Sequence, residues 1–207
     1  MKKTEKEREE NPERILKTLK AVIQAMTVAI ETRDPCTANH QRRVSDLALA
    51  IASEMNLPSN QIESIRMASA IHDIGKLSVP AELLSKPTKL TELEFRLIKC
   101  HSQIGYEILK DIEFPWPIAR IVLEHHERTD GSGYPNGLTG EGLLIESRIL
   151  AVADVVEAIA SHRPYRPARG IEASLDEISK KRDMLYDPEV TDACLRLFRE
   201  NNYELSG

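Results

Sequence analysis

The segment ASAIHDIGKL, residues 68–77, places His72 and Asp73 inside a run of apolar side chains. A buried carboxylate without a partner destabilises a folded protein by several kcal/mol, so such groups are paired, neutralised or bound to a metal. The segment is therefore either an exposed loop or a buried element whose two polar side chains are held by other parts of the fold.

Apolar residues recur at helical spacing along most of the chain. An amphipathic helix is predicted by the 4-3-4-3 spacing of Ile15, Leu19, Val22, Met26 and Ala29. It could pack on its own domain or pair with a second copy as a coiled coil. Similar apolar stripes predict helices over residues 37–55, 59–72, 91–108, 117–126, 149–156 and 187–198. Capping signals support two of these starts, a capping box at Thr91–Glu94 and the pair Asp187-Pro188.

Residues 129–142 hold five of the nine glycines and predict a long loop. No alternating strand pattern is visible anywhere in the chain, so we expect an all-α fold.

The 207 residues, 41% of them hydrophobic, suit one globular domain. We expect it to span residues 15–205, after a polar tail or linker over residues 1–14. The net charge of −5 argues against a protein that binds DNA or RNA polymers. No apolar run approaches the ~18 residues of a membrane span, and the N-terminus is too polar for a signal peptide. The three scattered cysteines fit reduced thiols, so we expect a cytoplasmic protein.

Several of the predicted helices carry one polar residue in the stripe that should face inward. A lone histidine on such a face is more often a satisfied core residue than a ligand. Here five of the six histidines share the placement with two aspartates, and so large a set is hard to satisfy by its own hydrogen bonds. We therefore predict a metal centre with the ligands His40, His72, Asp73, His101, His125, His126 and Asp154.

Imidazole and carboxylate ligands, with no cysteine pair nearby, fit iron, manganese, zinc or a similar divalent ion. Seven ligands exceed the needs of one ion, so we expect two ions roughly 3.5–4 Å apart, with Asp73 as the bridging carboxylate. Such a pair clamps a reacting phosphoryl group. Lys76 could reach a phosphate oxygen there, or remain a solvated lysine at a helix end. The residues alone predict a binuclear metal-dependent phosphohydrolase.

His72-Asp73, with the distant His40 and Asp154, resembles the signature of the HD superfamily of metal-dependent phosphohydrolases. The chain is more similar still to one branch, the HD-GYP family, through HDIGK (72–76), HH (125–126) and DGSGYP (130–135). The similarity extends through RDPCTANHQRRV (33–44), KPTKLTELEF (86–95) and HRPYRPARG (162–170), and covers about residues 15–200.

The resemblance implies an HD-domain-like helical bundle with additional C-terminal helices. It also implies hydrolysis of the bacterial second messenger cyclic di-GMP to linear pGpG, and often on to GMP. The implied centre contains iron or manganese, and a hydroxide bridging the two metals would attack phosphorus in line. Asp73 and Lys76 are then the expected catalytic residues, with Lys76 stabilising charge on the phosphate oxygens. One metal would be held by His40, His72, Asp73 and Asp154, and a second by Asp73, His101, His125 and His126.

The expected substrate-binding residues are Lys76, Tyr134, Arg163 and Arg166. Tyr134 could shape the pocket wall or simply brace the long loop. The two arginines lie in a segment that in similar proteins contacts the phosphate or guanine of the ligand, which suits the planar guanidinium, although a solvated basic loop is the alternative. Cys36 stands where relatives with a third metal have Glu, which favours two metals here.

Two further functions stay open at this point. The chain could be an HD-superfamily phosphohydrolase for another cyclic dinucleotide, such as cyclic GMP-AMP, or for a nucleotide monoester. It could also be a catalytically silent sensor of a cyclic dinucleotide. The partners we expect are the cyclic dinucleotide, a second copy bound through the N-terminal helix, and an upstream receiver or sensory domain.

Overall fold

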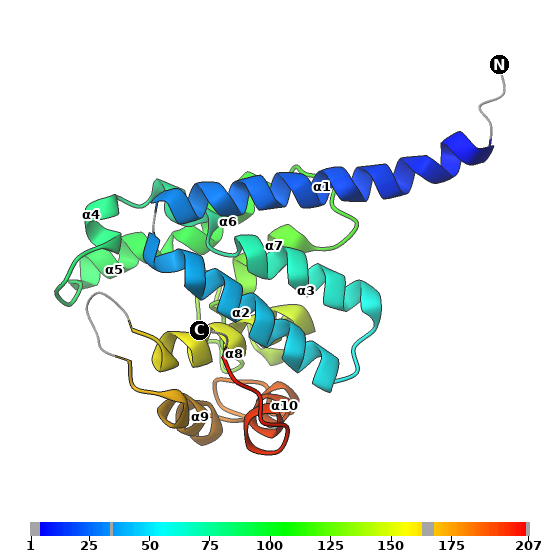
Figure 1. The fold of residues 1–207 in the computed structure, drawn as a ribbon. Coiled ribbons are helices and arrows are strands. Elements are labelled where there is room, and N and C mark those ends of the chain that lie inside the picture. The colour runs from blue at the N-terminus through cyan, green and yellow to red at the C-terminus, as the bar shows by residue number, and fades with distance from the viewer. Residues whose placement is uncertain (1–4, 34, 163–167, 206–207) are drawn as a thin grey trace.

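The computed structural model describes residues 5–33, 35–162 and 168–205, and the side chains of residues 14–32, 39–162 and 168–205. The described residues form helices joined by turns and contain no β-strand, which confirms the predicted all-α fold (Figure 1). In chain order the elements are α1 (Glu5–Arg33), α2 (Pro35–Glu54), α3 (Ser59–Ile71), the 3-10 helix η1 (Ile74–Ser78), α4 (Ala81–Leu84), α5 (Glu92–Lys99), α6 (His101–Leu109), α7 (Ile118–Glu124), the 3-10 helix η2 (Gly140–Gly142), α8 (Ile145–Ala160), α9 (Ile171–Lys180) and α10 (Pro188–Arg199).

Helix α2 packs against both α3 and α8. Val44, Leu47 and Ile51 recur at helical spacing on α2 and are fully buried, as an amphipathic pattern requires of the face turned to the core. The same core includes residues of the two neighbouring helices, namely Ile65, Ala68, Ile71, Ile149, Val152 and Val156. None of the described helices is both long and apolar enough to cross a membrane.

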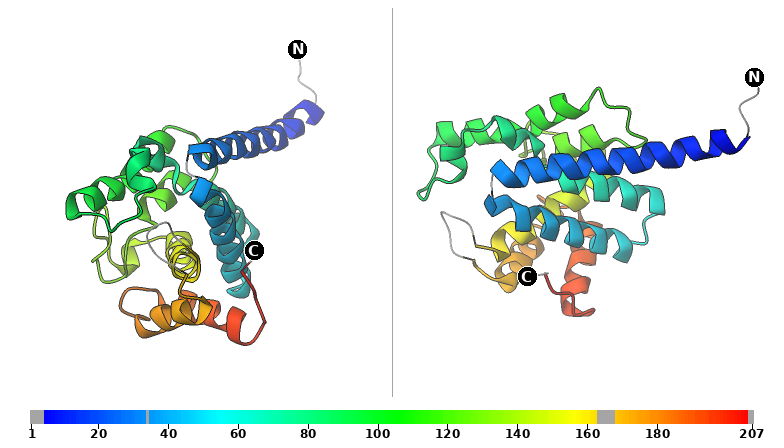
Figure 2. Two further views of the ribbon diagram at one scale, coloured as in Figure 1. Left: turned by 60° about the vertical axis from the view of Figure 1, so that its left-hand side comes forward. Right: turned by 45° about the horizontal axis from the view of Figure 1, so that its top comes forward.

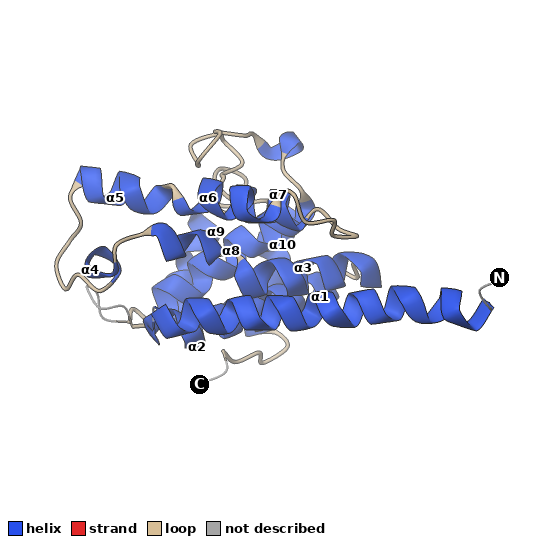
Figure 3. Ribbon diagram, turned by 90° about the horizontal axis from the view of Figure 1, so that it is seen from above, coloured by secondary structure: helices blue, strands red, loops and turns tan. Residues whose placement is uncertain are grey.

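Helix α1 lies along α2 and α3, and its N-terminal end extends beyond the rest of the molecule (Figures 1, 2 and 3). It begins at Glu5 rather than at Ile15, so most of the segment predicted to be a polar tail is helical. The physical reason is local, because Glu, Lys and Arg are good helix formers even without an apolar stripe. The division into a tail over 1–14 and a domain over 15–205 remains a prediction.

The predicted capping signals are confirmed. Thr91 and Glu94 form the reciprocal capping box of α5, and the Asp187 side chain accepts hydrogen bonds from the first turn of α10. The single helix predicted over 91–108 is wrong, because it breaks at Cys100 into α5 and α6. The Cys100 N–H donates to the carbonyl of Leu97, three residues earlier, as in a 3-10 helix. The carbonyl of Arg96, four residues earlier, accepts from the Cys100 thiol instead. The short helices α4 and α9 had no separate prediction.

Glycine at position 75 allows η1 to touch the backbone of α6. A Cβ atom added at Gly75 would lie 1.9 Å from the His101 carbonyl oxygen and 2.7 Å from the Gly105 nitrogen. Both neighbours are backbone atoms, which cannot rotate away. The missing side chain therefore lets the residues just before η1 approach the start of α6, and this brings Asp73 beside His101.

Replacing Gly75 with Ala is expected to lower the free energy of unfolding by about 2 kcal/mol or more, since overpacking a tight contact costs roughly 1–3 kcal/mol. Urea denaturation followed by circular dichroism measures the change. Gly142→Ala is the matched control, because a Cβ atom there would meet nothing within 4 Å. Equal stability of the two variants would contradict the tight contact.

Candidate metal centre

Most of the predicted ligands lie at helix ends. His72 follows the last residue of α3, and Asp73 precedes η1. His101 is the first residue of α6, and His125 and His126 directly follow α7. The other two predicted ligands lie inside helices, His40 in α2 and Asp154 in α8. Five separate segments of the chain thus contribute to one place.

The structure brings all seven predicted ligands together, six of them in two adjoining groups. His40, His72 and Asp73 form one group and His101, His125 and His126 the other, with the potential ligand atoms of each group within 4.8 Å of one another. Asp73 joins the groups, because its Oδ1 lies 3.4 Å from His101 Nε2 and its Oδ2 lies 3.5 Å from His72 Nε2. Asp154 also lies between them, 3.2 Å from His40 Nε2 and 3.8 Å from His126 Nδ1.

Three of the histidines are oriented in the same way. The Nδ1 atoms of His72, His101 and His125 lie 2.7, 2.7 and 2.6 Å from the carbonyl oxygen three residues earlier. A neutral imidazole that donates from Nδ1 has its Nε2 lone pair free for a metal. His72 Nε2 is buried and has no hydrogen-bond partner, a costly arrangement unless a ligand is bound. The donor set therefore fits divalent metal ions.

The electrostatics keep these groups in the forms that bind metals. Burial lowers the pKa of His125 to about 3, and it also lowers the pKa values of His101 and His126, so these imidazoles are neutral at pH 7. Burial alone would raise the pKa of Asp73, but the adjacent Lys76 ammonium, 2.7 Å from Oδ2, helps to hold it well below its usual value. Burial would likewise raise the pKa of Asp154, but the hydrogen bond with His40 and the neighbouring imidazoles together lower it.

The sequence interpretation missed Glu157, which is fully buried on α8. Its Oε2 atom makes a short hydrogen bond with His40 Nδ1, and its Oε1 atom accepts from Arg43 Nε at 2.8 Å. Glu157 thereby orients His40 as the backbone carbonyls orient the other histidines. The signal was its position three residues after Asp154, on the same face of a helix.

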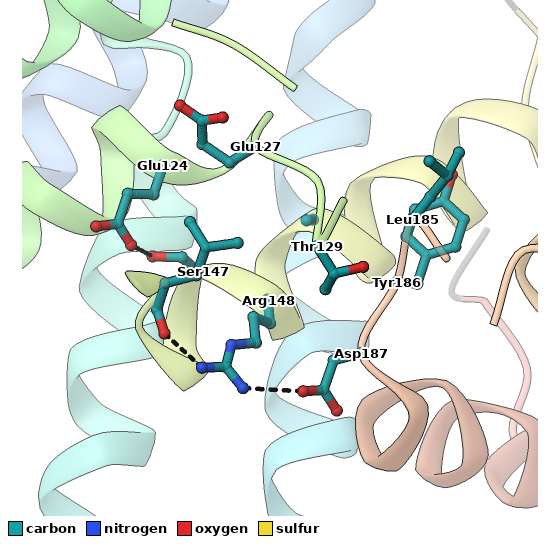
Figure 4. Close-up of a pocket in the computed structure, with 10 residues that line it drawn as sticks. Glu124, Glu127, Thr129, Ser147, Arg148, Leu185, Tyr186 and Asp187 are labelled. Atoms are coloured by element: carbon teal, nitrogen blue, oxygen red, sulfur yellow. Dashed lines mark hydrogen bonds and ion pairs between the residues drawn. The ribbon is translucent and has the colours of Figure 1, made fainter. Parts of the chain in front are cut away.

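Two further buried glutamates, also missed, fix the segment around His125 and His126. Glu124 accepts hydrogen bonds from Leu144 N and Ser147 Oγ, at 3.0 and 2.8 Å. Glu127 accepts from Asn136 N and Leu138 N in the glycine-rich loop, at 2.7 and 3.1 Å. Figure 4 shows Glu124 bonded to Ser147 and, nearby, the ion pair between Arg148 and Asp187 that joins α8 to the start of α10.

The centre opens into a cavity of about 340 Å³, which is large enough for part of a nucleotide ligand. Lys76 and Tyr134 both line it, as a substrate-binding role requires. The Tyr134 ring lies 4.7 Å from that of His126, and burial raises the pKa of its hydroxyl. Arg163, Arg166 and the side chain of Cys36 lie outside the described residues. His162, the histidine left out of the predicted set, is exposed.

A family model described as "HD domain" matches residues 24–190. The chain belongs to the HD domain family. This membership accounts for the His72-Asp73 pair and agrees with a metal-dependent hydrolase. Together with the proteins described next, it confirms the resemblance to the HD-GYP branch.

Two relatives and one solved structure illustrate the similarity of this HD domain to known proteins. A "Cyclic di-GMP phosphodiesterase response regulator RpfG" of Xanthomonas campestris is 45% identical over 170 residues, which cover 81% of this chain and 45% of the relative. A "3'3'-cGAMP-specific phosphodiesterase 3" of Vibrio cholerae is 33% identical over 171 residues, covering 83% of this chain and 37% of the relative. The chain thus spans less than half of either relative. The structure of Bd1817, an HDG"Y"P protein from Bdellovibrio bacteriovorus, matches with a TM-score of 0.67 at 15% identity, covering 92% of this chain and 66% of that one, and supports the fold.

Replacing Glu157 with Gln is expected to weaken metal binding roughly 10- to 100-fold, the usual cost of losing a partner that orients a ligating histidine. Titration of the metal-free protein with Mn²⁺ in a calorimeter measures the affinity. Glu54→Gln serves as control. Glu54 lies at the far end of α2, the helix that contains His40, and pairs with Arg196 of α10. Equal affinities of the two variants would show that Glu157 has no part in orienting His40.

Acid is expected to destabilise the metal-free protein below about pH 6.5. His125 has a pKa of about 3 in the folded state, against about 6.5 when unfolded, so between these values only the unfolded state binds the proton. The free energy of unfolding therefore falls as the pH falls through this window. The lowered pKa values of Asp73 and Asp154 act in the same direction below about pH 4. Urea midpoints measured with a chelator at about pH 7 and 5 test this, and a constant midpoint would contradict it.

Proposed function

We propose that the chain is a metal-dependent phosphodiesterase that hydrolyses a cyclic dinucleotide, with cyclic di-GMP as the preferred substrate. The observation that carries the proposal is the pair of His/Asp groups joined by Asp73 at the floor of a cavity. Two adjoining metal sites are the usual device for clamping a phosphodiester during an in-line displacement. The cyclic di-GMP phosphodiesterase name of the Xanthomonas relative supports the choice of substrate.

Two divalent ions, iron or manganese, are the cofactors that we propose. Their ligands would be divided as the resemblance implies, with Asp73 shared between the ions, and the two groups of potential ligand atoms support this division. When bound, the ions would polarise the phosphate and activate a water molecule near neutral pH. A third ion would need a ligand near position 36, where this chain has cysteine.

The residues of the chain would have separate tasks. The buried aspartates Asp73 and Asp154 stay ionised and balance part of the positive charge of the ions. The Lys76 ammonium lies at the cavity wall, where it would stabilise charge on the phosphate oxygens during the displacement. Arg163 and Arg166 are proposed to contact the outer parts of the substrate. The first product would be linear pGpG, and further cleavage would give GMP.

A second substrate is favoured by one specific observation. The Vibrio relative named for 3′3′-cGAMP is 33% identical, so a similar chain acts on a mixed dinucleotide. The metal centre would serve both substrates equally, because the scissile phosphodiester is the same. Only residues that contact the bases could choose between guanine and adenine.

Two partners besides the substrate are also proposed. Ile15, Val22 and Val28 are each about half exposed on α1 and would support pairing with a second copy through that helix. The expected upstream receiver or sensory domain is consistent with the greater length of the relatives. The cytoplasm stays the predicted location.

Protein loaded anaerobically with Fe²⁺ or Mn²⁺ is expected to convert cyclic di-GMP to linear pGpG, measured by liquid chromatography of timed samples. Asp73→Asn should reduce the rate by roughly a thousandfold, because it removes the carboxylate shared by both metal sites. The exposed Asp111→Asn is the control for the loss of one negative charge. Cleavage of 3′3′-cGAMP alone would favour the second substrate, and binding of metal and dinucleotide without any turnover would indicate a sensor.

A further inference from the structure

Lys99, at the end of α5, lies between two aromatic rings. Its Nζ atom is 4.9 Å from the centre of the Phe95 ring, one turn earlier on the same helix. The same atom is 5.0 Å from the centre of the Tyr134 ring, which belongs to the glycine-rich loop. Both distances are within the range of a cation–π interaction, so two separate segments hold the ammonium in place.

This cluster of Phe95, Lys99 and Tyr134 lies at the edge of the cavity. Tyr134 lines the cavity and stacks on His126 of the metal centre at 4.7 Å. Ile98, the residue before Lys99, lines the cavity as well. The Tyr134 ring therefore lies between the Lys99 ammonium and His126 of the metal centre.

Lys99 differs from nearby lysines in its partners. Lys76 is paired with Asp73 and Lys86 with Glu94, each at 2.7 Å. No carboxylate among the described residues forms an ion pair with Lys99. A partly buried ammonium that contacts only rings keeps its charge available for an anion, and rings do not compete for its hydrogen bonds as a carboxylate would.

The chemistry of the proposed substrate requires such a group. A cyclic dinucleotide has two phosphodiesters, separated by a nucleoside on either side, and only one can occupy the metal centre at a time. The other phosphate needs a cation outside the centre. Exposed aromatic surface beside that cation suits a base, because bases stack on rings regardless of their identity. Phe95, which is 46% exposed, provides that surface.

We propose that Lys99, held by Phe95 and Tyr134, binds the phosphate of the cyclic dinucleotide that is not being cleaved. The inference rests on the proposed function and adds to it a second anion site for the same substrate. The site gives no advantage to a substrate that contains a single phosphodiester. It therefore contributes to the preference of the enzyme for dinucleotides over smaller diesters.

The test compares two substrates in the metal-loaded protein. Lys99→Met keeps the apolar stem on the rings but removes the charge, and Lys99→Arg restores the charge. For Lys99→Met we expect KM for cyclic di-GMP to rise about tenfold more than KM for bis(p-nitrophenyl) phosphate, which has one phosphate, since a charged hydrogen bond is lost only with the larger substrate. Lys99→Arg should recover most of the difference. Lys17→Met, on the exposed side of α1, is the control for net charge.

Calorimetric titration of cyclic di-GMP into the Asp73→Asn protein, with and without Lys99→Met, separates the two proposals. A weaker Kd in the double variant supports the second anion site even if the wild type shows no turnover. Equal losses on both substrates, or an unchanged Kd and KM, overturn the role of Lys99 and leave the proposed function intact. Absence of both binding and turnover of cyclic di-GMP and 3′3′-cGAMP overturns the two together.

Discussion

The buried charge of Asp73 is the constraint on which the rest of the structure depends. Its carboxylate is 1% exposed and stays ionised, so it needs compensation from several directions. The Lys76 ammonium provides part of it from 2.7 Å, and a metal ion bound between the carboxylate and the Nε2 atoms of His72 and His101, which lie within 3.5 Å, would provide the rest. This arrangement requires the end of α3 to touch the start of α6, and glycine at position 75 permits that contact. The helix packing and the site chemistry therefore have the same cause.

Helix termini explain how the histidines are oriented with so few dedicated residues. The carbonyl oxygens near a helix end lack intrahelical partners, so they can accept the Nδ1–H of His72 or His125. His40 lies inside α2, where the carbonyls already serve the helix. Its Nδ1 requires a separate acceptor, and the buried Glu157 provides one from α8. The need for a dedicated carboxylate follows from the position of this candidate ligand within its helix.

The same distinction decides how much could be predicted from the sequence. Histidines and aspartates on otherwise apolar stripes are conspicuous, so the seven candidate ligands that the structure brings together and the all-α fold followed from periodicity, and the family from short motifs. Glu124, Glu127 and Glu157 were missed because glutamate is normally exposed, and only tertiary contacts reveal that these three point inward. The break at Cys100, where the backbone N–H bonds to Leu97 in the 3-10 manner, leaves no mark on the apolar periodicity. Nothing in the sequence indicated that Arg43 binds Glu157, apart from its position three residues after His40.

The glycine-rich loop is attached to the metal centre through consecutive residues. His126 is a candidate ligand, and Glu127 beside it accepts hydrogen bonds from the loop at Asn136 and Leu138. Gly133 packs so closely on the Glu127 backbone that a Cβ atom would approach Glu127 Cα to 2.4 Å. Tyr134 is consequently held at a fixed distance from the centre. If the centre binds the phosphodiester as proposed, discrimination among substrates would have to come from residues around it, such as Tyr134 of this loop and Ile98 of α5, which both line the cavity.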